Sequence, residues 1–264
     1  ECQEGRFPLR QSGHYHRFVE WHRTRDGYSI RQKGSENHDH RQKRRVSRGV
    51  NNCSEITNYY SQETKKMCVK AGAKQEDIFE LIGEITDESF NERLVSATVK
   101  KFGKLDVLVN NAGGSSFDHF GKGIFDWPVD EFDQMMELNV KHVLRLSQLS
   151  VPHLEKTKGA IVNVSSIAAH HTHSQMPYYS AAKSTLDQIT IQMAASLIKK
   201  GIRVNSVNPG PVATNAVVAS GGKKDEQDKM FAALGAGLPL GRIGVPEDIG
   251  KIIVFLADRS QSEI

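Results

Sequence analysis

The sequence has few cysteines and no long apolar run. Its 264 residues include three cysteines, Cys2, Cys53 and Cys68, whose spacing matches no common metal site and whose number is odd. We therefore expect a reducing compartment and a cytoplasmic location. No apolar run is long enough to span a bilayer, and the N-terminus lacks the apolar core of a signal peptide. These absences argue against a disulfide-rich secreted protein and predict no membrane partner.

The first 50 residues contain no alanine and only 11 apolar residues, too few to predict a packed layer. They carry 12 Lys and Arg against 6 Asp and Glu, whereas the rest of the chain carries 23 against 25. Either a disordered basic tail or a nucleic-acid-binding arm fits this composition, because clustered cations bind phosphate backbones. The alternate histidines His14 and His16, and His38 and His40, invite a zinc interpretation, but no cysteine completes a common ligand spacing. We predict no metal and no nucleic-acid partner.

From about residue 63 onward, strand and helix signals alternate. The short apolar runs cover residues 78–82, 105–110, 160–164 and 202–207, and helical spacing covers residues 90–103, 130–147, 179–199 and 247–257. Such alternation predicts an α/β fold, a parallel sheet with helices on both faces. Ligands of such sheets bind beyond the carboxyl ends of the strands. We therefore divide the chain into a basic segment, 1–62, and an α/β domain, 63–264.

One polar residue interrupts the apolar face of the helix predicted at 130–147. That face consists of Phe132, Met135, Met136, Val140 and Val143, and Asn139 lies in its middle. A buried amide needs hydrogen-bond partners. Asn139 is therefore either a satisfied core residue or part of a site.

The helix predicted at 179–199 opens with the sequence "YYSAAK", residues 178–183. Tyr179 and Lys183 are four residues apart and share a helix face, whereas four residues after Tyr178 stands Ala182. A lysine ammonium beside a phenol favours the phenolate and lowers the tyrosine pKa from about 10. This spacing selects Tyr179 over Tyr178 as a proton donor usable near neutral pH.

Small and polar residues follow three of the predicted strands. Ser165 and Ser166 come directly after residues 160–164, and Ser166 lies thirteen residues before Tyr179. The strand at 105–110 runs into "NNAG", residues 110–113, and the strand at 202–207 into "NPGPVAT", residues 208–214. Small residues let a ligand approach the backbone closely. The three strand ends therefore predict a ligand cleft at one edge of the sheet.

These motifs together resemble the short-chain dehydrogenase/reductase family. The quoted "NNAG", the "LNV" asparagine, the serine thirteen residues before the tyrosine of "YSAAK", and "NPGPVAT" match its order and spacing over about residues 70–258. The resemblance implies a three-layer, doubly wound Rossmann-type sheet and an oxidoreductase that uses NADP or NAD. It also implies a small carbonyl or alcohol substrate and a homo-oligomer, either a dimer or a tetramer.

The resemblance assigns roles to particular residues. Tyr179 would be the general acid/base, Ser166 would donate a hydrogen bond to the substrate oxygen, Lys183 would lower the tyrosine pKa and bind the nicotinamide ribose, and Asn139 would hold a relay water. The residues that would contact the cofactor are Glu84 and Ile85 near adenine, Asn110, Ala112 and Gly113 near its ribose, and Pro209, Gly210, Val212 and Thr214 near nicotinamide. Glu84 stands where the family usually has aspartate.

The glycine-rich phosphate loop of that family, T-G-x-x-x-G-x-G, does not occur in residues 1–62. The chain also begins with Glu1 rather than Met and ends at Ile264, where we expect one more strand. We therefore expect a fragment, a processed chain or an incomplete gene model, with N-terminal strands missing or corrupted.

An alternate reading frame offers an origin for the N-terminal residues. Trp21 is encoded only by UGG and histidine codons begin with C, so the frame that joins the two codons reads GGC, a glycine. Neighbouring codons permit the rest of the phosphate loop, and residues 13–48 permit a strand, loop, helix and second strand. An arginine after that second strand would favour NADP. Residues 49–62 permit the ends of a retained intron. We hypothesise that the segment is an out-of-frame translation.

The sequence therefore predicts an oxidoreductase that moves hydride between NAD(P) and a carbonyl or secondary alcohol. Two alternatives stay open: a scaffold that keeps the fold without catalysis, and a nucleic-acid binder that uses the basic segment. Residues 211–240 would form the lid and substrate pocket, and their mixture of apolar, glycine and charged residues indicates no particular substrate.

Overall fold

The computed structural model describes residue 62 and residues 64–115, 122–171, 175–214 and 224–261. Residues 64–70 are helical. The elements that follow are η1 (Gln75–Asp77), α3 (Glu88–Phe102), β1 (Val107–Asn110), η2 (Ile124–Asp126), α4 (Asp130–Met136), the π-helix η3 (Glu137–Lys141), α5 (His142–Thr157), β2 (Ala160–Val164), η4 (Ile167–Ala169), α6 (Pro177–Leu197), η5 (Ile198–Lys200), β3 (Arg203–Val207), α8 (Lys224–Ala236) and α9 (Pro246–Ala257). The histidine pairs and the alternate-frame loop lie outside the described residues.

Within the described residues, three strands form a parallel sheet in the order β1-β2-β3. Val109 pairs with Val162 in one ladder, and Val162 with Asn205 in the other. Every residue of β1 and β2 is buried, as expected for strands that are covered on both faces. The strands predicted at 105–110, 160–164 and 202–207 are confirmed, with β2 matching its predicted bounds.

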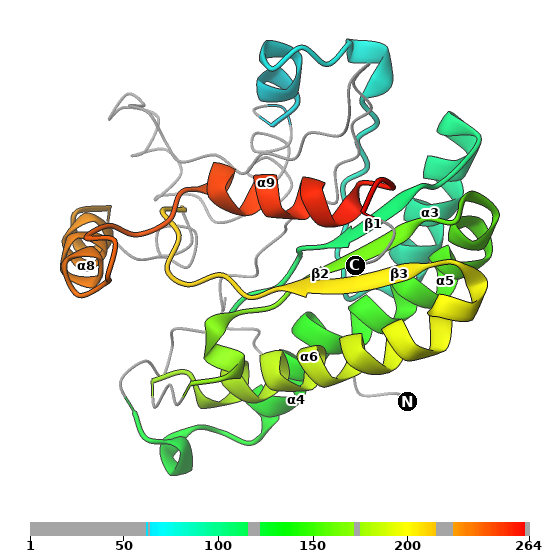
Figure 1. The fold of residues 1–264 in the computed structure, drawn as a ribbon. Coiled ribbons are helices and arrows are strands. Elements are labelled where there is room, and N and C mark those ends of the chain that lie inside the picture. Colours follow the sequence, from blue (N-terminus) through cyan, green and yellow to red (C-terminus); the bar gives the residue numbers. More distant parts are fainter. Residues whose placement is uncertain (1–61, 63, 116–121, 172–174, 215–223, 262–264) are drawn as a thin grey trace, which may run out of the picture.

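Helices cover both faces of this sheet (Figure 1). On one face, Val107, Val162 and Val207 pack against Ile253 and Ala257 of α9. On the opposite face, alternate strand residues join a larger core that includes residues of α3 and α5, with α6 residues packed against it: Leu108, Ile161 and Val204 from the strands, Leu94 and Val95 from α3, Leu146 and Leu154 from α5, and Met193 and Leu197 from α6. The period-two alternation of the strands thus produces the predicted three layers.

Two predicted elements differ in the structure. Residues 78–82 form no strand; Ile78 instead packs against Cys68 and Ala73. A strand needs a hydrogen-bonded neighbour, and among the described residues none pairs with β1 on the side away from β2. The helix predicted at 130–147 is a succession of α4, η3 and α5 that extends to Thr157. A π-helix adds one residue per turn, a local change that apolar periodicity does not reveal.

Side chains fix both ends of α9. Pro246 occupies the first turn, and the Asp248 carboxylate accepts a hydrogen bond of 3.0 Å from the Val245 amide. At the other end, the Arg203 guanidinium donates to the Leu256 and Asp258 carbonyls over 2.8 and 2.9 Å. Arg203 is only 9% exposed, and it is positioned where helix carbonyls have no intrahelical partner. These bonds hold α9 against β3. None of the described helices has the length and apolar character needed to cross a membrane.

Candidate active site

The carboxyl ends of the three strands meet at one edge of the sheet, because the strands are parallel. The pairing between β2 and β3 continues past their ends, since the Ser165 amide donates to the Val207 carbonyl over 2.8 Å. The Ile167 amide likewise donates to the Pro209 carbonyl over 3.0 Å. The segments that follow β2 and β3 therefore run side by side, and residues 111–113 follow β1 at the same edge.

Asn139 lies in η3 and is fully buried. Its side-chain Nδ2 donates to the Gly114 carbonyl over 2.9 Å and to the Met135 carbonyl over 3.0 Å, while its Oδ1 accepts from the Gly114 amide over 3.1 Å. Gly113 has a φ of +154°, and a Cβ there would lie 2.8 Å from Asn139 Oδ1 and 3.4 Å from Lys183 Nζ. Glycine therefore lets the end of "NNAG" approach both side chains.

Tyr179 and Lys183 lie in the first two turns of α6, which begins at Pro177. The Lys183 ammonium is 5.6 Å from the centre of the Tyr179 ring. Lys183 is 4% exposed, and its Nζ donates to the Val164 carbonyl at the end of β2 over 2.9 Å. A buried ammonium requires such an acceptor. The predicted face shared by the tyrosine and the lysine is therefore directed at the carboxyl edge of the sheet.

The two serines after β2 have different surroundings. Ser165 is 4% exposed, and its hydroxyl donates to the Lys183 carbonyl over 3.2 Å. Ser166 is half-buried, and its Oγ accepts a hydrogen bond of 3.1 Å from the Ala168 amide as the N-cap of η4. A hydroxyl that accepts still has its own hydrogen to donate. Ser166 is therefore the serine whose hydroxyl retains a hydrogen for a ligand.

Tyr178, the rival of Tyr179, is engaged elsewhere. Its hydroxyl donates to the Trp127 carbonyl over 3.2 Å. Its ring makes edge-to-face contacts with Trp127 and Phe132, with centroid separations of 5.7 and 5.6 Å. Tyr178 thus holds the segment before α4 against α6, a tertiary role that its position beside Tyr179 does not indicate.

The predicted nicotinamide and ribose contacts lie at the same edge. Ala112 and Gly113 are buried, and Asn110 is 1% exposed, with its Nδ2 donating to Asn163 Oδ1 over 2.8 Å inside the sheet. Only the backbone of Asn110 is therefore offered to a ligand. The predicted contacts after β3 include Pro209, Gly210 and Thr214; between the last two, Val212 forms a bridge with Gly244.

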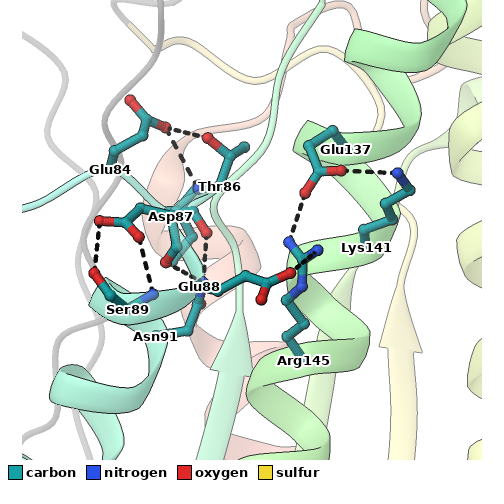
Figure 2. Close-up of polar contacts among 10 residues, drawn as sticks. Glu84, Thr86, Asp87, Glu88, Ser89, Asn91, Glu137, Lys141 and Arg145 are labelled. Atoms are coloured by element: carbon teal, nitrogen blue, oxygen red, sulfur yellow. Dashed lines mark hydrogen bonds and ion pairs between the residues drawn. The ribbon is translucent and has the colours of Figure 1, made fainter.

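The predicted adenine contacts, Glu84 and Ile85, lie in the turn before α3, and Figure 2 shows the Glu84 side chain. Glu84 Oε1 accepts from Thr86 Oγ1 over 3.1 Å, so this carboxylate is directed back into its own turn. Ile85 is buried, and its carbonyl accepts from Asn91 Nδ2 over 2.9 Å. Asp87 caps α3, and the hydrogen bonds that its carboxylate accepts, above all from the Ser89 hydroxyl, lower its pKa.

Four charged residues that the sequence reasoning missed connect this turn to η3. Figure 2 shows the Arg145 guanidinium between Glu137 and Glu88. Glu137 accepts from Arg145 Nη1 over 2.7 Å, and Lys141 Nζ lies 3.0 Å from its other oxygen. Partial burial opposes ionisation of Glu137, but these two cations outweigh it and lower its pKa. The sequence signal for this network was the four-residue separation of Glu137 and Lys141, which places the two side chains on one helix face.

His142, at the start of α5, was also missed. Its side chain is fully buried, and neither ring nitrogen has a hydrogen-bond partner among the described residues. Burial lowers the pKa of His142 to about 4; the Glu137 carbonyl opposes this shift and the Lys183 ammonium adds to it. His142 is therefore neutral at physiological pH. Its position one turn after Asn139 on the buried face was the sequence signal.

The described residues fit the nicotinamide half of a dinucleotide. At the carboxyl edge of the sheet, Gly113 has no side chain, so a ligand can approach its backbone closely. The Lys183 ammonium lies at the same edge, and Gly210, after β3, is exposed. No group of three or more potential metal ligands occurs in the described ranges. Residues 1–61, where the phosphate loop was hypothesised in another frame, lie outside them.

Known proteins are similar to this chain in sequence and architecture. Residues 52–264 match the family model described as Enoyl-(Acyl carrier protein) reductase. The chain is 35% identical to 7alpha-hydroxysteroid dehydrogenase of Escherichia coli (strain K12) over 180 residues. This match covers 68% of the chain and 67% of that protein. It is 31% identical over 184 residues to L-fucose dehydrogenase of Bos taurus, covering 68% and 66% of the two chains.

Solved structures of several dehydrogenases and reductases are also similar to this chain. A short-chain dehydrogenase/reductase of unknown function from Caenorhabditis elegans, solved with cofactor, is 37% identical and superposes with a TM-score of 0.75 over 78% of each chain. A 7 alpha-hydroxysteroid dehydrogenase complexed with NADH and 7-oxo glycochenodeoxycholic acid is 32% identical, with a TM-score of 0.65 over 80% of this chain and 76% of that one. ElxO with NADP bound is 28% identical, with a TM-score of 0.67 over 78% and 81%.

Proposed function

This chain belongs to the short-chain dehydrogenase/reductase family and is an NAD(P)-dependent oxidoreductase, and we propose that Tyr179 is the acid/base of its reaction. The substrate that we propose is a small molecule with a carbonyl group or a secondary alcohol. The observation that carries the proposal is the orientation of Tyr179 and Lys183 on one face of α6, with Lys183 Nζ bound to the carbonyl at the end of β2.

In this proposal the bound cofactor supplies or accepts the hydride, and the side chains handle the proton. Tyr179 gives a proton to the forming alkoxide in reduction and takes one from the alcohol in oxidation. The ammonium of Lys183 stabilises the phenolate by charge. Ser166 donates its free hydroxyl hydrogen to the same substrate oxygen, an interaction that strengthens as negative charge develops there.

Asn139 has a second role in the proposal. Its side-chain amide is already bonded to Gly114 on both its nitrogen and its oxygen. We therefore assign the binding of a relay water to the main-chain carbonyl of Asn139 in η3, since π-helices occur frequently at functional sites. The Asn139 side chain holds η3 against Gly114, and the water bound to the Asn139 carbonyl is hydrogen-bonded to the Lys183 ammonium in this proposal.

The cofactor contacts belong to the same proposal. Lys183 also binds the nicotinamide ribose, while the backbone of Asn110, Ala112 and Gly113 faces the adenosine ribose. Pro209, Gly210, Val212 and Thr214 border the nicotinamide ring. Glu84 and Ile85 border adenine, with the Ile85 amide as the donor, because the Glu84 carboxylate is bonded within its turn. If the alternate reading frame is the expressed one, the arginine after its second strand favours NADP over NAD.

The remaining parts of the proposal concern the context of the protein. The domain that performs the reaction comprises residues 63–264, preceded by a basic segment at 1–62. We propose a homo-oligomer in the cytoplasm, the latter because the three cysteines are odd in number and have no metal-type spacing. The relatives act on steroid and sugar alcohols by name, so both classes belong in a substrate screen.

Tyr179→Phe tests the central assignment, with Tyr178→Phe as the matched control. Both variants lose one hydroxyl from adjacent residues, but only the Tyr179 hydroxyl is proposed to transfer a proton. We expect kcat to fall by about 10²–10⁴-fold in Tyr179→Phe and by less than about threefold in the control. NADPH and NADH fluorescence titrations then measure cofactor binding, which both variants retain. Equal turnover by Tyr179→Phe and the unmodified protein contradicts the assignment; cofactor binding without any turnover indicates the scaffold alternative.

A further inference from the structure

A cluster of three polar side chains lies behind Ser166, outside the four proposed catalytic residues. Asp187 is on α6, two turns beyond Tyr179; His170 is the C-cap of η4; and Asn208 follows β3 directly. Asp187 Oδ2 accepts from Asn208 Nδ2 over 2.7 Å and lies 2.9 Å from His170 Nε2. The Asp187 side chain is 14% exposed, so this carboxylate is largely removed from water. Its donors are therefore its main stabilisation.

The hydrogen-bond arrangement of Asn208 is determined by its neighbours. Its Oδ1 accepts from the Ser206 hydroxyl over 3.2 Å, which orients the amide. The two Nδ2 hydrogens then go to Asp187 Oδ2 and, over 3.2 Å, to the main-chain carbonyl of Ser166. No hydrogen is left for His170 Nε2, which lies 3.2 Å from the same nitrogen. His170 Nε2 therefore carries the hydrogen that it donates to Asp187.

These bonds act on the turn that carries Ser166. Asn208 holds the Ser166 carbonyl, the Pro209 carbonyl holds the Ile167 amide, and Ser184 Oγ donates to the Ala169 carbonyl over 2.7 Å. The backbone of Ser166 is thereby bonded to the segment after β3, and the turn that follows it is bonded to α6. Within this set, the Asp187 carboxylate, together with the Ser206 hydroxyl, keeps the Asn208 amide directed at Ser166.

We propose that Asp187 is a positioning residue for Ser166, acting through the Asn208 amide, with His170 as the second donor that holds the carboxylate. The proposal rests on the proposed function in so far as Ser166 donates to the substrate oxygen. Misplacing such a donor weakens its interaction with the reacting oxygen, so the effect falls on kcat rather than on KM.

Three variants separate this role from a structural one. Asp187→Leu removes the acceptor of the Asn208 amide. Asp187→Asn retains one oxygen for Asn208, and its amide donates to His170 once the neutral ring presents Nε2 as an acceptor. Asn208→Ala removes the intermediary and leaves Asp187 in place. All three are compared as full-length chains, with thermal unfolding as a check on folding.

The first readout needs no substrate. Hydrogen exchange of peptides that span residues 165–171 reports the Ile167 amide, which is bonded to the Pro209 carbonyl, and the Ala168 and Ala169 amides, which are bonded to Ser166. We expect about 10-fold faster exchange there in Asp187→Leu and Asn208→Ala, little change in Asp187→Asn, and no change in peptides from β2. Unchanged exchange in Asp187→Leu and Asn208→Ala overturns the proposal, whether or not the protein turns over a substrate.

The second readout is a double-mutant cycle on kcat. We expect Asp187→Leu to lower kcat about 10-fold with KM unchanged, and to have no further effect in an Asn208→Ala or a Ser166→Ala background. Additive losses in both backgrounds overturn the proposal, because Asp187 then acts by another route. If exchange responds as expected but Ser166→Ala retains full activity, the proposed role of Ser166 fails and the positioning of its turn stands.

Discussion

The buried histidine of α5 makes the stability of this protein sensitive to mild acid. His142 is fully buried without a hydrogen-bond partner among the described residues, and burial lowers its pKa from 6.5 to about 4. The folded state therefore binds fewer protons than the unfolded state between these two values. The contribution of neutral His142 is fully present above about pH 6.5 and is lost as the pH falls towards about 4.

The magnitude follows from the same two pKa values. At pH 5 the unfolded histidine is almost fully protonated and the folded one almost fully neutral, which corresponds to about 2 kcal/mol of lost stability relative to pH 7.5. We expect the free energy of unfolding, measured with urea, to fall by about that much more in the unmodified protein than in His142→Leu between these pH values. Other titrating groups contribute equally to both proteins and cancel in the difference.

His171→Gln serves as the control, because His171 is exposed and its removal leaves the buried site intact. We expect this control to retain the acid sensitivity of the unmodified protein. An unchanged pH dependence in His142→Leu refutes the reasoning, since the histidine is then either hydrated or protonated in the folded state. His142→Leu also removes two buried nitrogens that lack partners, so at pH 7.5 we expect a stability equal to or above that of the unmodified protein.

Two further changes test the packing around the site. Gly113→Ala places a Cβ 2.8 Å from Asn139 Oδ1, and we expect it to cost about 1–3 kcal/mol in thermal unfolding and to lower kcat; Gly72→Ala, also at positive φ but with nothing within 4 Å, is the control, and an equal effect of both on kcat contradicts the crowding argument. Arg203→Met removes the side-chain donor to the Leu256 and Asp258 carbonyls, and we expect a loss of about 1–3 kcal/mol in urea unfolding, against less than about 0.5 kcal/mol for the exposed Arg242→Met.

Much of the fold was predictable because strands and helices place apolar residues at short, regular intervals along the sequence. The strand at residues 160–164 was predicted at its observed bounds, since every side chain of β2 is buried and a run of apolar residues is the direct sign of that environment. The same reasoning failed at residues 78–82. An apolar run shows that a segment is buried, but pairing depends on a neighbouring strand, which a local pattern does not reveal.

The candidate site likewise has one part that a local sequence pattern predicted and another part that it did not. The four-residue separation of Tyr179 and Lys183 defines a helix face, and it selected the tyrosine whose neighbour, Tyr178, is bonded to Trp127 in the structure. By contrast, the charged network around Arg145 and the acceptors of the Asn139 amide depend on residues from separate elements. No periodicity along one element identifies such partners.

The sequence by itself determined which short segments are buried, which helix faces carry Tyr179 and Lys183, and, through ordered motifs, the family. Only the tertiary structure decided what the polar side chains do to one another. His170, Asp187 and Asn208 are separated by up to 38 residues, yet they meet behind Ser166 because the middle of α6 packs beside the carboxyl end of β3. The physical reason is that hydrogen bonds have a range of about 3 Å, so they are set by where elements pack rather than by position along the chain.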